Sequence, residues 1–171
     1  ATVALAVVTA SCGGGGDDGP EPLAYGKSAT IGYEDANTKT ATKIEVTVLG
    51  VRPGTVAELE AGGFNLDDDE KDASVLYVDA KYKNVGDQAV GKIGHVDIED
   101  TKGERISSTI VINLGGDTFD KCPADNKGDL TPGAEHQHCS LFLVPKGRTA
   151  EWVRATDYTI ADLPRVYWPV S

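Results

Sequence analysis

The chain has 171 residues, of which 40% are hydrophobic and 25% charged, and this length and balance fit a single globular domain. Sixteen lysines and arginines face 27 acidic residues, so the net charge is −11. This charge disfavours nucleic-acid binding, which needs basic side chains on phosphates, and attachment to anionic lipid through a basic patch. No apolar run reaches the roughly 20 residues that a membrane-spanning helix needs.

The N-terminal run ATVALAVVTA has the length of the hydrophobic part of a signal peptide. It ends in the small residues Thr9, Ala10 and Ser11 ahead of Cys12, and TASC resembles the lipobox of bacterial lipoproteins, although Thr9 stands where that family has leucine. In such proteins the cysteine carries a diacylglycerol. Its two acyl chains anchor the protein stably to the membrane, whereas a single chain gives only marginal binding. The resemblance implies that residues 1–11 are the remnant of a signal peptide and that Cys12 is lipidated. The alternatives are a secreted protein with a free Cys12, or a core strand misread as a signal, which fits poorly because GGGGDDGPEP follows at once.

Residues 13–22, GGGGDDGPEP, have the composition of a flexible linker, because glycine, acidic residues and proline bury no apolar surface. A random coil of this length reaches about 17 Å. We therefore expect residues 12–22 to be a lipidated cysteine with a disordered tether, and residues 23–171 to form the folded domain.

Apolar and polar residues alternate with period two over most of the rest of the chain, which is typical of half-buried β-strands separated by turns rich in glycine, proline and asparagine. The run CSLFLVP at 139–145 is continuously apolar and is expected to be a central strand buried on both faces. Seven or eight strands with frequent turns predict a β-sandwich. The predicted strands are 43–51, 74–84, 95–100, 105–114, 139–145, 150–155 and 165–170.

One short helix is predicted after the first of these strands. Thr55 and Glu58 have the spacing of a capping box, and Gly62 and Gly63 would end the helix. A second helical turn is expected near residues 158–162.

Two segments resemble the immunoglobulin-like domain of many bacterial secreted lipoproteins. They are YVDAKYKNVGDQAV at 77–90, where a strand ends in an Asn-Val-Gly turn, and LTPGAEHQHCSLFLVPKG at 130–147, where a Pro-Gly turn introduces a strand that ends in Pro-x-Gly. The resemblance implies an immunoglobulin-like β-sandwich over most of residues 40–170, and the family has no assigned biochemical activity. The antibody pattern is absent, because Trp152 and Trp168 both follow the last cysteine.

Two cysteines remain once Cys12 is assigned to lipid. An exported domain would oxidise Cys122 and Cys139, so we predict a disulfide that pins the polar loop around Cys122 to the strand that begins at Cys139. The alternative is two free thiols.

Metal sites have two candidate locations. His136 and His138 would point to the same side of a strand, with His95 approaching from another, and three imidazoles suit zinc or copper. The acidic run Asp67–Asp72 could hold calcium, but it lacks the spacing of an EF-hand loop. Solvent-facing histidines and a solvated acidic loop are the favoured interpretation, so no metal ligand and no cofactor is assigned.

An aromatic recognition surface is a further possibility, although in a β-rich protein most aromatic side chains pack in the core or across strands. The residues concerned are Tyr77, Tyr82, Trp152, Tyr167 and Trp168.

Catalytic signatures are missing, since the chain has no Gly-x-Ser-x-Gly elbow and its paired cysteines leave no thiol nucleophile. We therefore expect a non-enzymatic module on the outer face of the bacterial membrane, anchored by lipid on Cys12. It would bind an unknown protein, peptide or envelope component and no nucleic acid. The alternative is a lipoprotein that handles zinc, copper or calcium through His136, His138, His95 or residues 67–72.

Overall fold

The structure, a computed structural model, describes residues 21–35, 38–91, 96–109, 119–123, 128–157, 159 and 165–170. The expected signal peptide, Cys12, most of the tether, His95 and nearly all of the helical turn expected at 158–162 lie outside these residues. Within them, no helix is long and apolar enough to cross a membrane.

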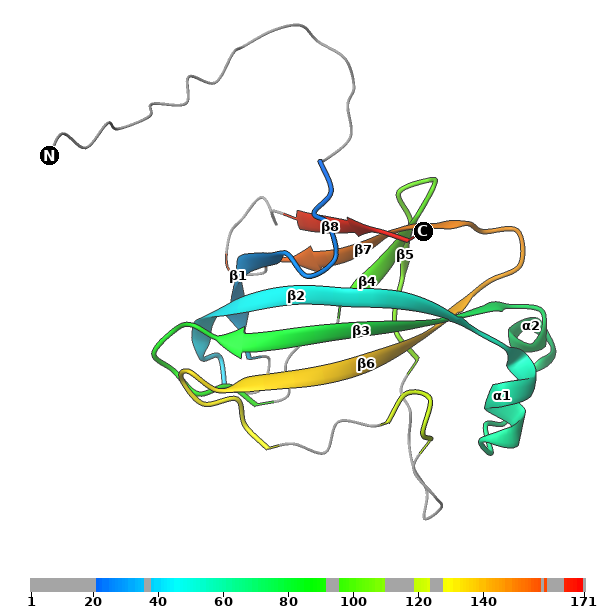
Figure 1. Ribbon diagram of the computed structural model, residues 1–171, viewed down its shortest axis with the longest axis horizontal. Helices are drawn as coiled ribbons and strands as arrows, with labels where there is room; N and C mark the ends of the chain where they lie inside the picture. Colours follow the sequence, from blue (N-terminus) through cyan, green and yellow to red (C-terminus); the bar gives the residue numbers. More distant parts are fainter. Residues whose placement is uncertain are drawn as a thin grey trace, which may run out of the picture.

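Two four-stranded antiparallel sheets make up an all-β sandwich, as predicted (Figure 1). The first sheet has the order β1-β2-β3-β6 and the second the order β5-β4-β7-β8. The elements are β1 (Ser28–Glu34), β2 (Ala41–Gly54), α1 (Val56–Ala61), α2 (Asp68–Lys71), β3 (Ser74–Asn84), β4 (Asp97–Asp100), β5 (Arg105–Ile106), β6 (Glu135–Val144), β7 (Ala150–Thr156) and β8 (Arg165–Pro169).

The connectivity is of the immunoglobulin type. In that fold the first, second and fifth strands share one sheet, while the third, sixth and seventh share the other. Here β2, β3 and β6 are neighbours, as are β4, β7 and β8, with β1 added beside β2 and β5 beside β4. The expected immunoglobulin-like sandwich is therefore the observed architecture.

Alternate residues of both sheets point inward and form the main core. On β3, for example, Val78, Ala80 and Tyr82 are buried between the sheets, while Lys81 and Lys83 point outward. Trp168 and Ile98 of the second sheet are fully buried opposite them. The period-two alternation in the sequence thus identified the inward side of each of these strands.

Both open sides of the sandwich are closed by the chain itself. On one side the segment after Glu21 runs from the second sheet to the first: the amide of Leu23 donates to Tyr167 on β8, and the amide of Gly26 donates to Val48 on β2 (Figure 1). On the other side the chain leaves β5, and Thr109 bridges to Leu141 on β6. Of the described part of the strand expected at 105–114, which ends at residue 109, only Arg105–Ile106 belongs to the second sheet, because the chain then crosses to β6. Residues 110–114 lie outside the described residues.

A second apolar cluster lies on the outer face of the first sheet, where β3 and β6 are covered by α1 and by residues around Phe119. Its buried members are Leu59, Val75, Tyr77, Phe119, Cys122 and Leu141. The expectation that β6 is a central strand is wrong, because β6 ends the strand order of its sheet. Its run is apolar because one face meets the main core and the other meets this second cluster.

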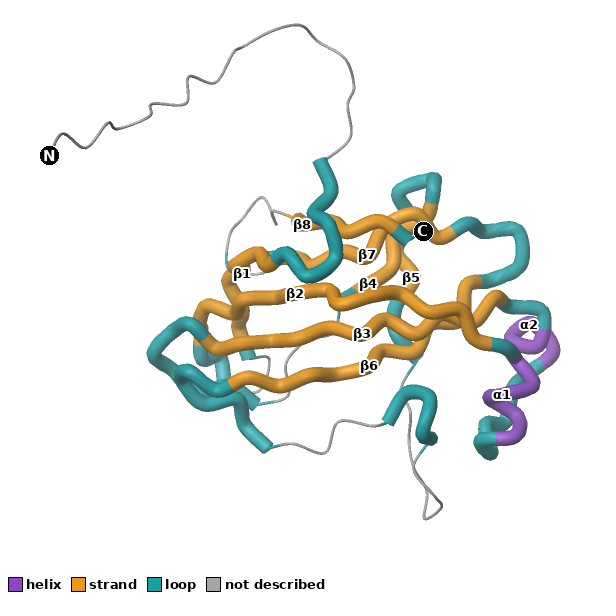
Figure 2. The backbone as a smooth tube through the Cα atoms, in the orientation of Figure 1, coloured by secondary structure: helices purple, strands orange, loops and turns teal. Residues whose placement is uncertain are grey.

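Two short helices follow β2 at one end of the first sheet (Figure 2). In α1 the capping box of Thr55 and Glu58 is present and Gly62 is the C-cap, as predicted. The single helix and the solvated loop expected for residues 67–72 are both corrected: α2 forms a turn of helix there, because Asp67 and Glu70 make a second capping box. The acidic residues nonetheless remain at the surface.

The Asn-Val-Gly turn after β3 is organised by one buried amide. Asn84 is fully buried, and its Nδ2 donates to the carbonyls of Gln88 and Leu130 at 2.7 and 2.9 Å. Its Oδ1 accepts from the amide of Gly86 and the hydroxyl of Thr42. A Cβ on Gly86 would collide with Thr42, so the glycine permits this close approach.

Candidate functional site

The outer face of the second sheet carries a layer of charged and aromatic side chains. Register places Asp97 of β4 opposite Arg154 of β7, and Arg154 opposite Tyr167 of β8. Because paired residues of antiparallel strands point to the same face, side chains from all four strands gather here. We call this set the arginine face; its members are Asp97, Glu99, Arg105, Trp152, Arg154, Arg165 and Tyr167.

Arg154 lies at the centre of the arginine face and faces both carboxylates. Its Nη1 donates to Oε2 of Glu99 at 2.7 Å, and its Nη2 lies 3.7 Å from Oδ2 of Asp97. Arg105 reaches the same aspartate from β5, with Nε 3.0 Å from Oδ1. Arg165 reaches the glutamate from β8, with Nη1 3.8 Å from Oε2. Two carboxylates are thus held among three guanidinium groups.

The arginine face has a buried floor, made by Asp97, Glu99 and Arg154, and an exposed rim, made by Arg105, Arg165 and Trp152. The side chains of Asp97 and Arg154 are 6% and 7% exposed, whereas those of Arg105 and Arg165 are 52% and 45% exposed. Burying charges is costly unless they are paired, and the geometry of the floor supplies that pairing. The rim presents guanidinium groups to solvent.

Hydrogen-bond donors exceed acceptors in the arginine face. Three guanidinium groups offer about fifteen N–H donors and two carboxylates offer about eight lone-pair positions. Within the described part of the chain, Nε of Arg154 is buried without a hydrogen-bond partner, and only Asp97 pairs with Arg105. Nε of Arg154 is too buried to be reached from outside, so among the three arginines only the exposed side chains of Arg105 and Arg165 can meet groups of another molecule.

An aromatic pair borders the charges. The rings of Trp152 and Tyr167 meet edge to face with centroids 6.2 Å apart, and the Tyr167 hydroxyl lies 3.5 Å from Oε2 of Glu99. Trp152 is half-buried, so its ring remains partly accessible. Arginine, tryptophan and tyrosine are the residue types that dominate binding energy at protein interfaces.

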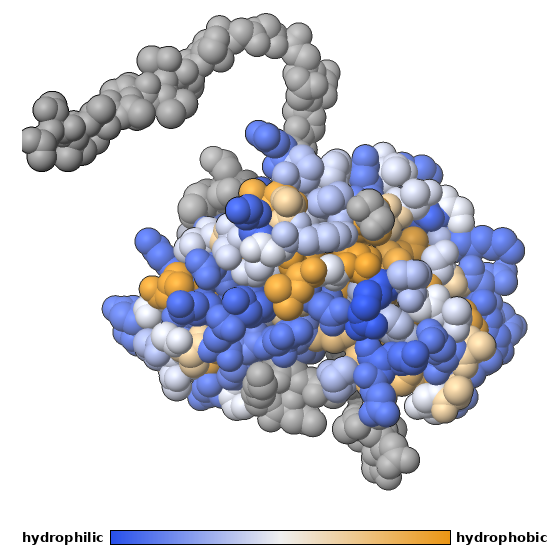
Figure 3. Space-filling view, viewed as in Figure 1, coloured by the Kyte–Doolittle hydropathy of each residue, from blue (hydrophilic) through white to orange (hydrophobic). Residues whose placement is uncertain are grey.

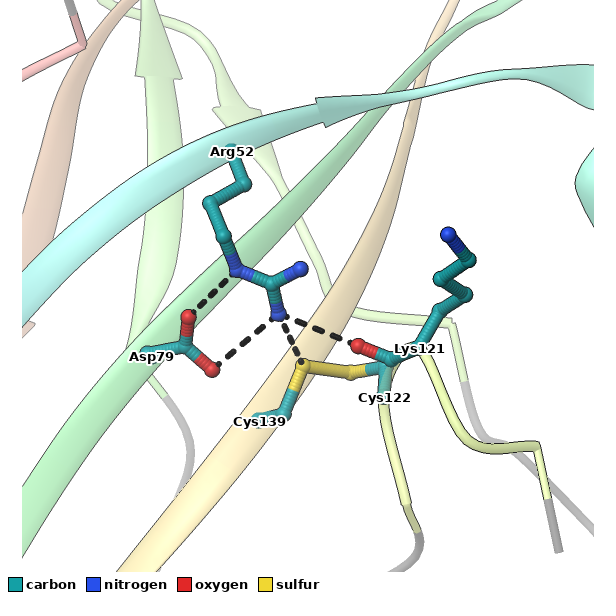
Figure 4. The surroundings of a disulfide bond; sticks show 5 residues. All are labelled: Arg52, Asp79, Lys121, Cys122 and Cys139. Carbon is teal, nitrogen blue, oxygen red and sulfur yellow. Dashed lines mark hydrogen bonds and ion pairs between the residues drawn. A yellow bond between two sulfur atoms is a disulfide. The ribbon is translucent and has the colours of Figure 1, made fainter.

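The outer face of the first sheet holds the predicted disulfide. Cys122 and Cys139 are bonded, with Cα atoms 5.2 Å apart, and the bond joins the loop after Phe119 to β6 (Figure 4). Arg52 of β2 secures the same loop: Nε donates to Asp79 at 2.7 Å, and Nη2 donates to the carbonyl of Lys121 at 3.0 Å. The bridge pins this loop to the sheet, as expected.

Two pKa values around the disulfide are shifted by these contacts. The hydrogen bond to Asp79 raises the pKa of Arg52 above its ordinary value. Burial under the second apolar cluster raises the pKa of Tyr77, and the nearby carboxylate of Glu58 raises it further. Both groups therefore keep their protons at neutral pH, and their roles here are structural.

His136 and His138 lie on one side of β6, as predicted, and they point toward the second sheet because they pair with Tyr82 and Ala80. Cys139 points to the opposite side and is used by the disulfide. In the described part of the chain, no group of three histidine, cysteine or acidic side chains could hold a metal ion.

Four of the five carboxylates in residues 67–72 are engaged by the protein itself. Asp67 and Glu70 cap α2, Asp68 lies 3.3 Å from Lys71, and Asp72 lies 2.9 Å from Lys146. These side chains are spread along a helical turn, and their contacts are those of a solvated surface segment.

Most of the candidate aromatic residues are packed inside. Tyr82 and Trp168 belong to the main core, and Tyr77 belongs to the second apolar cluster although its alternation placed it on the outer side of β3. Only Trp152 and Tyr167 lie on the arginine face.

Sequence reasoning missed the charged members of the arginine face. The alternation in HVDIED and AEWVRA already placed Asp97, Glu99 and Arg154 on the polar sides of their strands. The pairing of β4 with β7 is what joins them, and that pairing links segments more than 50 residues apart.

No family model and no curated protein matches the chain. Among solved structures, it is similar to a conserved hypothetical protein from Bacillus anthracis, with 16% identity, a TM-score of 0.47, and coverage of 85% of this chain and 98% of that one. A likeness this distant assigns neither a family nor a function.

Proposed function

We propose that this chain is a non-catalytic binding module of the immunoglobulin-like lipoprotein class, held on the outer face of a bacterial membrane by lipid on Cys12. The arginine face is the observation that supports a binding role. It combines a rigid sheet, a buried ionic floor and a partly accessible rim of arginine and tryptophan side chains, which together resemble the centre of a protein interface.

The partner contacts the rim residues Arg105, Arg165 and Trp152, while Asp97, Glu99 and Arg154 keep them in place. Because the floor is already paired, the rim side chains are held in fixed positions before the partner arrives, and less side-chain entropy is lost on binding. A metal-handling role has no specific observation in its favour among the described residues.

The binding role can be tested by radical footprinting of side chains. The full chain carrying Cys12→Ser, which removes the contribution of lipid, is oxidised with and without solubilised envelope membranes of the organism that makes it. We expect the oxidation of Trp152 to fall while that of Phe64, on the other sheet, stays constant. Unchanged oxidation of Trp152, or an equal fall at both residues, would contradict the proposal.

The anchor is tested separately by cell fractionation. Cys12→Ser should move the protein from the membrane fraction to the medium, because a single thioether-linked diacylglycerol is the proposed attachment. Cys122→Ser together with Cys139→Ser is the matched control, since it removes the two disulfide-bonded cysteines but leaves the anchor. Membrane retention of the Cys12→Ser protein would contradict the anchor and leave the binding role in place.

A further inference from the structure

We propose that the folded domain lies against the membrane surface through an apolar patch beside the point where the tether leaves it, an inference that rests on the proposed lipid anchor. The patch occupies the open side of the sandwich between β2 and β8. The arginine face is on the outer side of the second sheet, so this contact leaves it free for a partner. We call the set the tether-side patch; its members are Leu23, Tyr25, Leu49, Val51 and Val170.

The exposed member of the patch lies on a part of β2 that has no neighbouring strand on one side within the described residues. Pairing between β1 and β2 stops at Ser28 and Thr47, whereas β2 continues to Gly54. Leu49 comes directly after this paired part and is 40% exposed. In the described part of the chain, only one other large hydrophobic side chain, that of Val85, is as open to solvent.

The segment after the tether and the end of β8 complete the patch. The amide of Gly26 donates to Val48, the residue before the exposed leucine, and the hydroxyl of Tyr25 donates to Pro169, the residue before Val170. Figure 3 shows hydrophobic side chains along β2 and between β2 and the end of β8. Four members of the patch are half-buried and pack against the main core: Leu23, Tyr25, Val51 and Val170.

The length of the tether decides which side of the domain can reach the membrane. Residues 13–20 separate Cys12 from Glu21, where the described chain begins. A chain of this length spans about 17 Å as a random coil and at most about 31 Å when fully extended. A folded domain of this size is about 40 Å across. The tether is therefore too short to turn the opposite side of the domain to the bilayer, and it keeps the tether-side patch close to the lipid.

The anchor also makes a small apolar patch sufficient for contact. A short flexible linker holds the two surfaces at an effective concentration in the millimolar range, so a contact too weak to recruit a free domain becomes populated. Insertion of an exposed leucine among acyl chains removes its apolar surface from water. The net charge of −11 gives the chain no attraction to anionic lipid, so the contact is apolar and not ionic.

The test uses the full lipidated chain in phosphatidylcholine vesicles that contain a lipid with a nitroxide high on its acyl chain. Ala24→Cys, at an exposed position beside the patch, carries a fluorophore that the nitroxide quenches. It is the one thiol open to labelling, because the proposed lipid occupies Cys12 and the disulfide occupies the other two cysteines. We expect quenching that persists at high salt, and an at least twofold loss of this quenching when Leu49→Ser is added.

The matched control is Val85→Ser, which removes the other exposed hydrophobic side chain. Val85 is 44% exposed, and its amide donates to Lys43, which lies about 20 Å along β2 from Leu49. This variant should be quenched like the parent protein. Equal melting temperatures of the two serine variants would show that both are folded.

Vesicle flotation distinguishes failure of this inference from failure of the proposed function. A protein that does not float rejects the anchor, and the inference with it. Flotation with equal quenching in the Leu49→Ser variant and its parent rejects only the membrane contact and leaves the anchor and the binding role in place. An equal loss in the Val85→Ser variant would also overturn the inference. So would light scattering that finds a dimer of the Cys12→Ser protein that Leu49→Ser abolishes, because the patch would then bind a second copy of the chain.

Discussion

Arg154 donates a 2.7 Å hydrogen bond to Glu99 across the β4–β7 pair, and only 7% and 12% of the two side chains are exposed. In a two-layer sandwich the outer face of a sheet usually meets water. Here it contains a desolvated ion pair. The pair fixes the positions of the exposed arginines around it, which is the basis of the binding role proposed above.

Removing the central cation should destabilise the fold. Arg154→Ala leaves Asp97 and Glu99 buried without their main partner, and breaking a buried pair in this way costs about 3 kcal/mol or more. Urea unfolding at neutral pH measures the free energy. The control is Arg165→Ala, whose side chain is 45% exposed and which should cost far less. Equal losses in the two variants would argue against a buried ionic floor.

Removing the disulfide should weaken the domain without changing its topology. Cys122→Ala with Cys139→Ala opens a loop with a sequence separation of 17, which in the chain-entropy model costs about 3 kcal/mol. The second apolar cluster still holds Phe119, so the folded state persists at low temperature. Thermal unfolding of the double variant, compared with the parent protein with and without reductant, gives the loss. If reductant also lowered the melting temperature of the double variant, the loss could not be assigned to the Cys122–Cys139 bond.

The buried amide of Asn84 should be irreplaceable by a residue of the same shape. Asn84→Asp retains both acceptor positions but loses the donors to Gln88 and Leu130, and it buries a charge, so we expect a loss of about 3 kcal/mol or more. Chemical unfolding monitored by circular dichroism checks this value. Asn65→Asp, at an exposed position, is the control, and a similar loss there would show a general effect of added negative charge.

Asp157 should make stability depend on acidic pH. Burial alone would raise its pKa, but hydrogen bonds from Thr159 and from the amide of Gly32 outweigh burial and lower the pKa below its ordinary value. These contacts measure 2.7 to 2.9 Å. A lowered folded-state pKa means that this contribution is full above the unfolded value of about 4 and is lost as pH falls through the folded value.

Asp157→Asn tests that sign. The variant should be less stable than the parent at pH 7. The difference should shrink as the pH falls from about 4 through the lowered folded-state pKa, because the unfolded carboxylate takes up a proton first. Urea unfolding at pH 7 and across the acidic range measures this difference, with Asp68→Asn on the exposed α2 as the control. A difference that grows in acid would mean that the carboxylate is not stabilised in its charged form.

The sequence predicted those parts of the fold that depend on local pattern. Strict alternation identified β2 and β3 and their inward sides, and the Thr55–Glu58 spacing identified α1. It missed β1, in which Ala29, Ile31 and Tyr33 are only partly buried and Gly32 interrupts the pattern. It misplaced β6, because an apolar run does not show whether its second face meets a neighbouring sheet or a covering helix.

The candidate site was harder to predict for a different reason. Each of its charged residues lies on the polar side of a strand, where a solvated side chain is the ordinary expectation. Their burial results from cross-strand pairing between β4, β5, β7 and β8. The local alternation of residues does not show which strands pair when they are far apart in the sequence. The disulfide was predictable because, once Cys12 was assigned to lipid and export was expected, the cysteine number left a single pair.

The most direct measurement of the central claim is a radical footprint of the full chain carrying Cys12→Ser, oxidised with and without solubilised envelope membranes. We expect Trp152, on the arginine face, to be protected from oxidation while Phe64 and the exposed Leu49, on the side of the first sheet, react as before. Protection confined to Phe64 and Leu49, or no protection at Trp152, would contradict the binding role of the arginine face.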